Sequence, residues 1–164
     1  MRARILLGLA LAAAFAASPA VAADHGAGAR FHATTSLQTS LGFDPSCAGL
    51  AIAATGGVIG TELGAGAWSG HECLDFVQRP GTILVHGSAT VTAADGSRLF
   101  LTYDVVTPFD PTGAIHATGT YSISGGTGRF AGATGSGTTN AEASAVTFAA
   151  SDVLDGTIRL ANDS

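Results

Sequence analysis

The sequence predicts an all-β protein, and three observations support this fold class. No long segment of the 164 residues repeats its apolar positions at the helical period of 3.6. Short runs that alternate apolar and polar residues follow one another instead, separated by turn residues, as in an antiparallel barrel or sandwich. These runs number about eight, which is enough strands to close a small barrel. Closure also removes the exposed sheet edges that an apolar β protein must protect.

The N-terminus has the pattern of a secretory signal. Arg2 and Arg4 precede an apolar run at residues 5–17, and small residues then offer cleavage sites after Ala22 or Ala23. We expect residues 1–23 to be removed and residues 24–164 to form one exported domain, periplasmic or extracellular. The apolar run is short for a membrane span, so a retained anchor is the weaker alternative and no membrane contact is expected after removal.

The first strands are the weakest part of the prediction. Residues 31–39 alternate and predict the first strand. Residues 42–66 look irregular, with weak strands at 50–53 and 58–59. Residues 68–77 are ambiguous, so no register is assigned to them.

From residue 81 onward the pattern is firm. Residues 82–93 alternate, an Asp-Gly turn follows at 94–97, and residues 98–107 return as the partner strand of a hairpin. After a loop with two prolines, residues 114–124 alternate again. We predict the remaining strands at residues 130–140, 145–150 and 156–160.

The most informative segment is YSISGGTGRFAGATGSGT, residues 121–138. Its core resembles the GGTGRFxGAxG signature of the dirigent and allene oxide cyclase barrel proteins, including secreted bacterial relatives. The resemblance covers about residues 81–160 and implies an antiparallel barrel. In such a barrel we expect Gly125, Gly126 and Gly128 to form a turn and Phe130 to anchor the core.

The same glycines match the G-x-G-x-x-A pattern of dinucleotide binding, but their context does not. The glycine-rich residues that follow would not form the helix that this motif requires. We therefore expect no nucleotide and no other cofactor.

Charge excludes further classes of partner. The chain has no lysine, and without residues 1–23 its five arginines oppose twelve acids, a net charge of −7. Such a domain does not favour nucleic acid or an anionic membrane surface.

Cys47 and Cys73 are the only cysteines, and in an exported domain we expect them to form a disulfide, two free thiols being the alternative. The nearby His71, Glu72 and Asp75 could in principle bind a metal, but adjacent residues need not converge, and we expect no metal site.

Alternation also predicts the interior. It places Tyr103 and Tyr121 on inner faces that are otherwise apolar, with His86, His116 and Asp104 on the outer faces, an assignment that a one-residue slip would reverse. The predicted pocket residues are Tyr103, Tyr121, Leu101, Ala117 and Gly119. The two phenols are the only polar groups on these predicted inner faces, so any ligand is expected to be mainly apolar and to meet no formal charge. A fully packed interior is the alternative.

Three functions are compatible with these features. The first, which the resemblance to dirigent proteins suggests, is to bind or orient a small apolar molecule. The second is a cofactor-independent isomerase or cyclase, as the allene oxide cyclase side of the resemblance implies. The third is a non-catalytic exported structural or interaction protein, with homo-oligomerisation left open. The neutral inner faces favour binding over catalysis.

Overall fold

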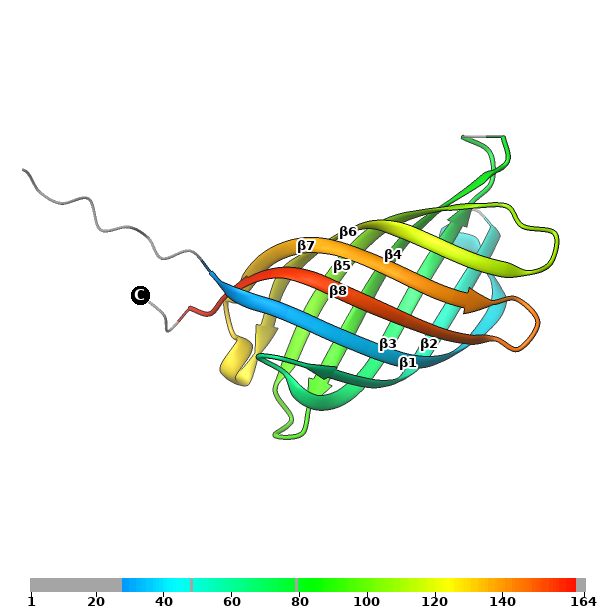
Figure 1. Ribbon diagram of the computed structural model, residues 1–164. Helices are drawn as coiled ribbons and strands as arrows, with labels where there is room; N and C mark the ends of the chain where they lie inside the picture. The colour runs from blue at the N-terminus through cyan, green and yellow to red at the C-terminus, as the bar shows by residue number, and fades with distance from the viewer. Residues whose placement is uncertain (1–27, 48, 79, 162–164) are drawn as a thin grey trace, which may run out of the picture.

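The protein forms a closed, eight-stranded antiparallel β-barrel in a computed structural model that describes residues 28–47, 49–78 and 80–161 (Figure 1). Each strand pairs with its neighbours in sequence, and β8 closes the barrel against β1. The strands are β1 (Ala29–Asp44), β2 (Gly49–Gly60), β3 (Gly64–Asp75), β4 (Thr82–Ala93), β5 (Arg98–Pro108), β6 (Ala114–Thr127), β7 (Thr134–Ser144) and β8 (Ala149–Arg159). Two 3₁₀ turns complete the fold, η1 (Pro45–Cys47) and η2 (Gly128–Phe130). The predicted all-β barrel is confirmed.

The predicted alternation is confirmed in β4, β5 and β6. Their inner faces are the ones assigned from the sequence, and the paired strands keep these residues in one layer. Apolar side chains are buried there because the inner face of every strand points into the closed barrel. The buried residues of these inner faces include Val85, Ala89, Val91, Leu99, Leu101, Val105, Ala117, Tyr121 and Ile123.

Several predicted boundaries were wrong. Residues 42–66 are not irregular: they hold the end of β1, all of β2 and the start of β3, where inward glycines such as Gly56 obscure the alternation. The strands predicted at residues 145–150 and 156–160 are replaced by one continuous strand, β8, whose middle contains the polar Asp152 and Asp155, while residues 145–148 form the connection before it. The strand predicted at 130–140 begins at Thr134, four residues later.

One end of the barrel is closed by packed side chains. Phe130, the anchor predicted from the sequence, is fully buried in η2 at this end. Arg129 lies beside it and donates a hydrogen bond of 2.8 Å from Nη2 to the carbonyl oxygen of Leu63, which ties η2 to the β2–β3 turn. The other buried side chains at this end include Phe31, Leu63, Leu99 and Ile158.

The glycines before Phe130 act differently from the prediction. Gly125 and Gly126 lie within β6 rather than in a turn, and only Gly128 belongs to η2. Gly125 has a φ of 141° where the β5–β6 register shifts, a backbone conformation that glycine adopts readily. A Cβ on Gly126 would lie 2.6 Å from the Cβ of Phe130, so a glycine at position 126 is needed for Phe130 to pack against β6.

The predicted signal segment, residues 1–23, lies outside the described residues. Within the part of the chain that the structure describes, no helix is long and apolar enough to cross a membrane.

Candidate functional site

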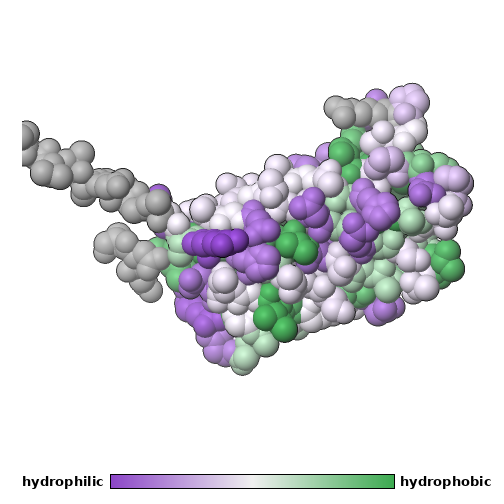
Figure 2. Space-filling view, in the orientation of Figure 1, coloured by the Kyte–Doolittle hydropathy of each residue, from purple (hydrophilic) through white to green (hydrophobic). Residues whose placement is uncertain are grey.

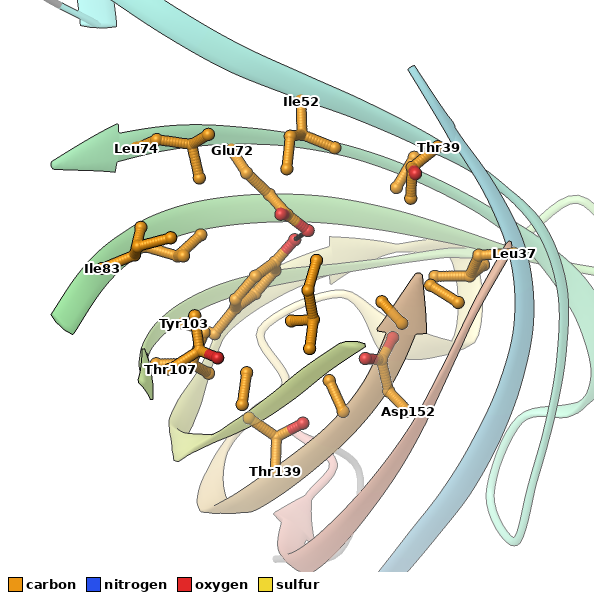
Figure 3. A pocket seen from close by; sticks show the side chains of 18 of the residues that line it. Leu37, Thr39, Ile52, Glu72, Leu74, Ile83, Tyr103, Thr107, Thr139 and Asp152 are labelled. Atoms are coloured by element: carbon orange, nitrogen blue, oxygen red, sulfur yellow. Dashed lines mark hydrogen bonds between the residues drawn. The ribbon is translucent and has the colours of Figure 1, made fainter. Parts of the chain in front are cut away.

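The barrel contains a cavity of about 310 Å³ at the end opposite Phe130. The packed interior considered as an alternative is therefore wrong for this half of the barrel. The lining is mainly apolar and comes from all strands (Figure 3). Its apolar members are Leu37, Leu41, Ile52, Ala54, Trp68, Leu74, Ile83, Val85, Val105, Ile115, Ala117, Ala141, Ala143, Ala145, Phe148, Ala150 and Leu154.

The mouth of the cavity is surrounded by exposed apolar side chains. The ends of β1, β3, β5 and β7 meet here with the starts of the strands that follow them (Figure 1). Figure 2 shows hydrophobic side chains at this end, on the right of the view, among polar ones. The exposed apolar residues of the strand ends and loops at this end are Leu41, Phe43, Leu50, Phe76, Val77, Phe109, Val146 and Phe148, which we call the apolar rim. Exposed apolar side chains grouped in this way are typical of a surface that an apolar ligand or partner meets.

Two carboxyl groups face the cavity, and one of them, that of Glu72, accepts a hydrogen bond from the phenol of Tyr103. Glu72 and Tyr103 point toward each other across the cavity wall, and the Tyr103 hydroxyl donates a hydrogen bond of 2.8 Å to Oε1 of Glu72 (Figure 3). Burial raises the pKa of the Glu72 carboxyl, and the hydrogen bond from Tyr103 opposes that rise. Burial, followed by the charge of Glu72, raises the pKa of the Tyr103 hydroxyl, which is therefore a donor throughout the physiological range.

Asp152 supplies the second carboxyl group, from β8. Its Oδ2 accepts a hydrogen bond of 2.9 Å from the hydroxyl of the buried Thr35, whose Oγ1 in turn accepts one from the Asp152 backbone amide. Burial raises the pKa of the Asp152 carboxyl. The two carboxyls are close enough for the charge of Asp152 to raise the pKa of Glu72 further.

Tyr121 lies deeper than Tyr103 and is 1% exposed. Its ring is 5.9 Å from that of Phe31. A Cβ on Gly156 would lie 2.6 Å from the Tyr121 hydroxyl, so this glycine makes room for the phenol. Burial raises the pKa of Tyr121 to about 12.

Two buried polar atoms of the lining have no partner among the described residues. They are the Tyr121 hydroxyl and the indole Nε1 of Trp68, whose side chain is 5% exposed. Trp68 stacks obliquely against Tyr103 with 6.2 Å between ring centroids. An unpaired polar group in an apolar wall costs stability, so these atoms are available to a ligand.

The predicted pocket residues divide into two groups. Tyr103, Tyr121 and Ala117 line the cavity. Leu101 is buried in the core below it, and Gly119 allows close approach of β5, since a Cβ there would lie 2.0 Å from the Asp104 carbonyl oxygen. Whether these residues bind a ligand stays a prediction.

The expectation of a neutral interior was wrong. His86, His116 and Asp104 do face outward, as alternation predicted. The acids came instead from segments to which no inner face had been assigned: Glu72 from the ambiguous residues 68–77 and Asp152 from the gap between two predicted strands. The missed signal was the alternation of Trp68, Glu72 and Leu74 in β3 and of Ala150, Asp152 and Leu154 in β8.

On the outer surface four histidines each contact a carboxylate. His32 bonds Asp155 at 2.7 Å and His71 bonds Asp44 at 3.0 Å. His86 bonds Asp104, and His116 pairs with Glu142. These pairs lie outside the barrel and do not contribute to the cavity.

The predicted Cys47–Cys73 disulfide is present and joins η1 to β3. His71 lies beside the two sulfur atoms, and these three residues form the one group of metal-ligand type found among the described residues. Bridged sulfurs are not thiolate ligands. His71 points outward to Asp44 and Glu72 points inward, so the three-ligand set of His71, Glu72 and Asp75 does not converge.

Comparison with known proteins gives no match: no family model, no curated protein and no solved structure is significantly similar to this chain. The resemblance of residues 121–138 to dirigent and allene oxide cyclase proteins therefore stays a prediction.

Proposed function

We propose that this protein binds a small, mainly apolar molecule in the cavity of its barrel. The observation that carries the proposal is a 310 Å³ apolar cavity with one end closed and the other opening at the apolar rim. Small-molecule sites have this form: a concave apolar wall with a few placed polar groups. The resemblance to dirigent proteins points to the same role.

Fluorescence of N-phenyl-1-naphthylamine, a neutral apolar dye, tests the proposal. Ala141→Phe places a large ring on the cavity wall, so we expect it to weaken dye binding by about tenfold or more, a loss of about 1.4 kcal/mol. Ala53→Phe introduces the same ring on the outer face of β2, where Ala53 is exposed, and should leave binding unchanged. If the dye does not bind, or if both variants affect it equally, the cavity is not the binding site.

A cofactor-independent isomerase or cyclase is the second candidate, and the Glu72–Tyr103 pair favours it. A carboxyl whose pKa is raised by burial is suited to general acid–base chemistry near neutral pH. The test is turnover of lipophilic epoxides by the wild type and by Glu72→Gln. Catalysis predicts that the variant loses turnover while it still binds the dye, whereas a binding protein shows no turnover in either form.

We further propose that the protein is exported, with cleavage near Ala23. The disulfide is compatible with an oxidising compartment. N-terminal sequencing of the protein from periplasm and medium tests this, because a chain that still begins at Met1 would contradict it.

A further inference from the structure

We infer that the cavity selects lipophilic cations, amines foremost, and that Glu72 and Asp152 hold the cationic group. The inference rests on the proposed binding function and names the class of ligand. Three features of the cavity wall support it: its charge, the free acceptor positions of its two carboxyls, and an unpaired donor on Trp68, which packs against the Tyr103 partner of Glu72.

The wall carries acids without bases. Among the described lining residues, Glu72 and Asp152 are the carboxyl groups, and no arginine or histidine accompanies them. The histidines of the barrel are occupied with carboxylates on the outer surface. Buried charges in proteins are normally paired, so the missing partner of this wall is a cation that comes from outside the chain.

The two carboxyls retain the capacity to accept it. Each accepts one side-chain hydrogen bond from a described residue, Glu72 from Tyr103 and Asp152 from Thr35. An ionised carboxylate has about four acceptor positions, and an ammonium has three donors. Each carboxyl can therefore accept a hydrogen bond from an ammonium, whose charge also offsets the repulsion that Asp152 exerts on Glu72.

The aromatic residues beside Glu72 suit the same group. Trp68 and Tyr103 present tilted rings within 6.2 Å of each other. Cations bind favourably over such faces, most strongly over tryptophan. The indole Nε1 of Trp68 has no partner among the described residues. Since it is a donor, a ligand oxygen next to the amine would satisfy it.

A metal ion fits the wall less well. Hard divalent cations take six or more oxygen ligands or retain several waters in a polar site. Here the two carboxyls and the hydroxyls of Thr39, Thr107, Thr139 and Ser144 belong to a lining that is otherwise mainly apolar. An organic cation can place its charge at the carboxyls and its apolar chain against the rest of the wall.

The experiment is calorimetric titration of the mature, disulfide-bonded protein with octylamine, 1-octanol and octanoate, which share a chain and differ in head group. We expect octylamine to bind about ten- to a hundredfold more tightly than octanol, the range for hydrogen bonds to a charged group, and octanoate to bind most weakly. The double variant Glu72→Gln/Asp152→Asn should bind octylamine and octanol within about threefold of each other. The matched control, Asp104→Asn/Glu142→Gln, removes the same two charges from the outer surface and should keep the wild-type preference.

Octanol or octanoate binding the wild type as tightly as octylamine would overturn the inference, as would loss of the preference in the outer-surface control. These results differ from failure of the proposed function. If all three compounds bind alike and Ala141→Phe weakens all of them, the cavity binds ligands without selecting cations. If none binds, both proposals fail.

Discussion

Replacement of Phe130 by alanine tests how the closed end of the barrel is held. The ring is fully buried, seated over Gly126, with the Arg129 guanidinium 4.7 Å from its centroid. Truncation of a buried phenylalanine removes its transfer free energy and leaves a cavity, for a total of about 3–5 kcal/mol. We expect the upper half of this range, because the strands around the ring are fixed by their pairing and cannot collapse into the space.

Urea denaturation of the disulfide-bonded protein measures this loss as a shift of the midpoint at constant slope. Phe43→Ala is the matched control: Phe43 is 78% exposed on the apolar rim, so its removal should change the free energy of unfolding by less than about 0.5 kcal/mol. A loss below about 1 kcal/mol for Phe130→Ala would refute the anchor role.

Three further predictions concern the interior and the disulfide. Cys47→Ser/Cys73→Ser should lower the free energy of unfolding by about 3 kcal/mol, because the disulfide closes a loop of moderate length in the unfolded chain; an unchanged urea midpoint would contradict this. Tyr121→Phe should raise the free energy of unfolding by about 1 kcal/mol, since the hydroxyl is buried without a described partner; a decrease would show that the hydroxyl is bonded. Burial raises the pKa of Glu72 in the folded state, so the wild type loses stability as pH rises from the unfolded value of about 4.3 through the raised native one. The free energy of unfolding of Glu72→Gln should therefore exceed that of the wild type by more at pH 8 than at pH 4. Urea curves that give the same difference between the two proteins at both pH values would contradict the raised pKa of Glu72.

Much of the barrel could be predicted from the sequence because its second half alternates without interruption. In β4, β5 and β6 the inner positions are apolar or small, and the Asp-Gly turn before Ser97 fixes the β4–β5 register. Phe130 could be identified as an anchor because one aromatic ring stood among small residues.

The candidate site could be predicted only in part, for a physical reason. Sequence patterns assign polar residues to the outer face, and the cavity wall breaks this rule at Glu72 and Asp152. The two segments were left without a register because an acid interrupts their apolar alternation. The tyrosines were found because phenols are compatible with an apolar face.

The substitution of Glu72 separates a structural role from a functional one. A carboxyl kept in an apolar wall destabilises the empty barrel, because burial raises its pKa and its ionised form lacks a cation among the described residues. Replacement of a residue that serves folding alone should lower the free energy of unfolding. Glu72→Gln is instead expected to raise it at neutral pH. The same substitution is expected to reduce the preference for octylamine over octanol, because only Asp152 then remains to hold the cation. Opposite effects on stability and selectivity would mean that the energetic cost of the carboxyl is offset when a cation binds, since a ligand stabilises the state to which it binds. If Glu72→Gln instead lowers stability and leaves the preference for octylamine unchanged, the hydrogen bond from Tyr103 is structural and the cation would have to be held by Asp152 alone.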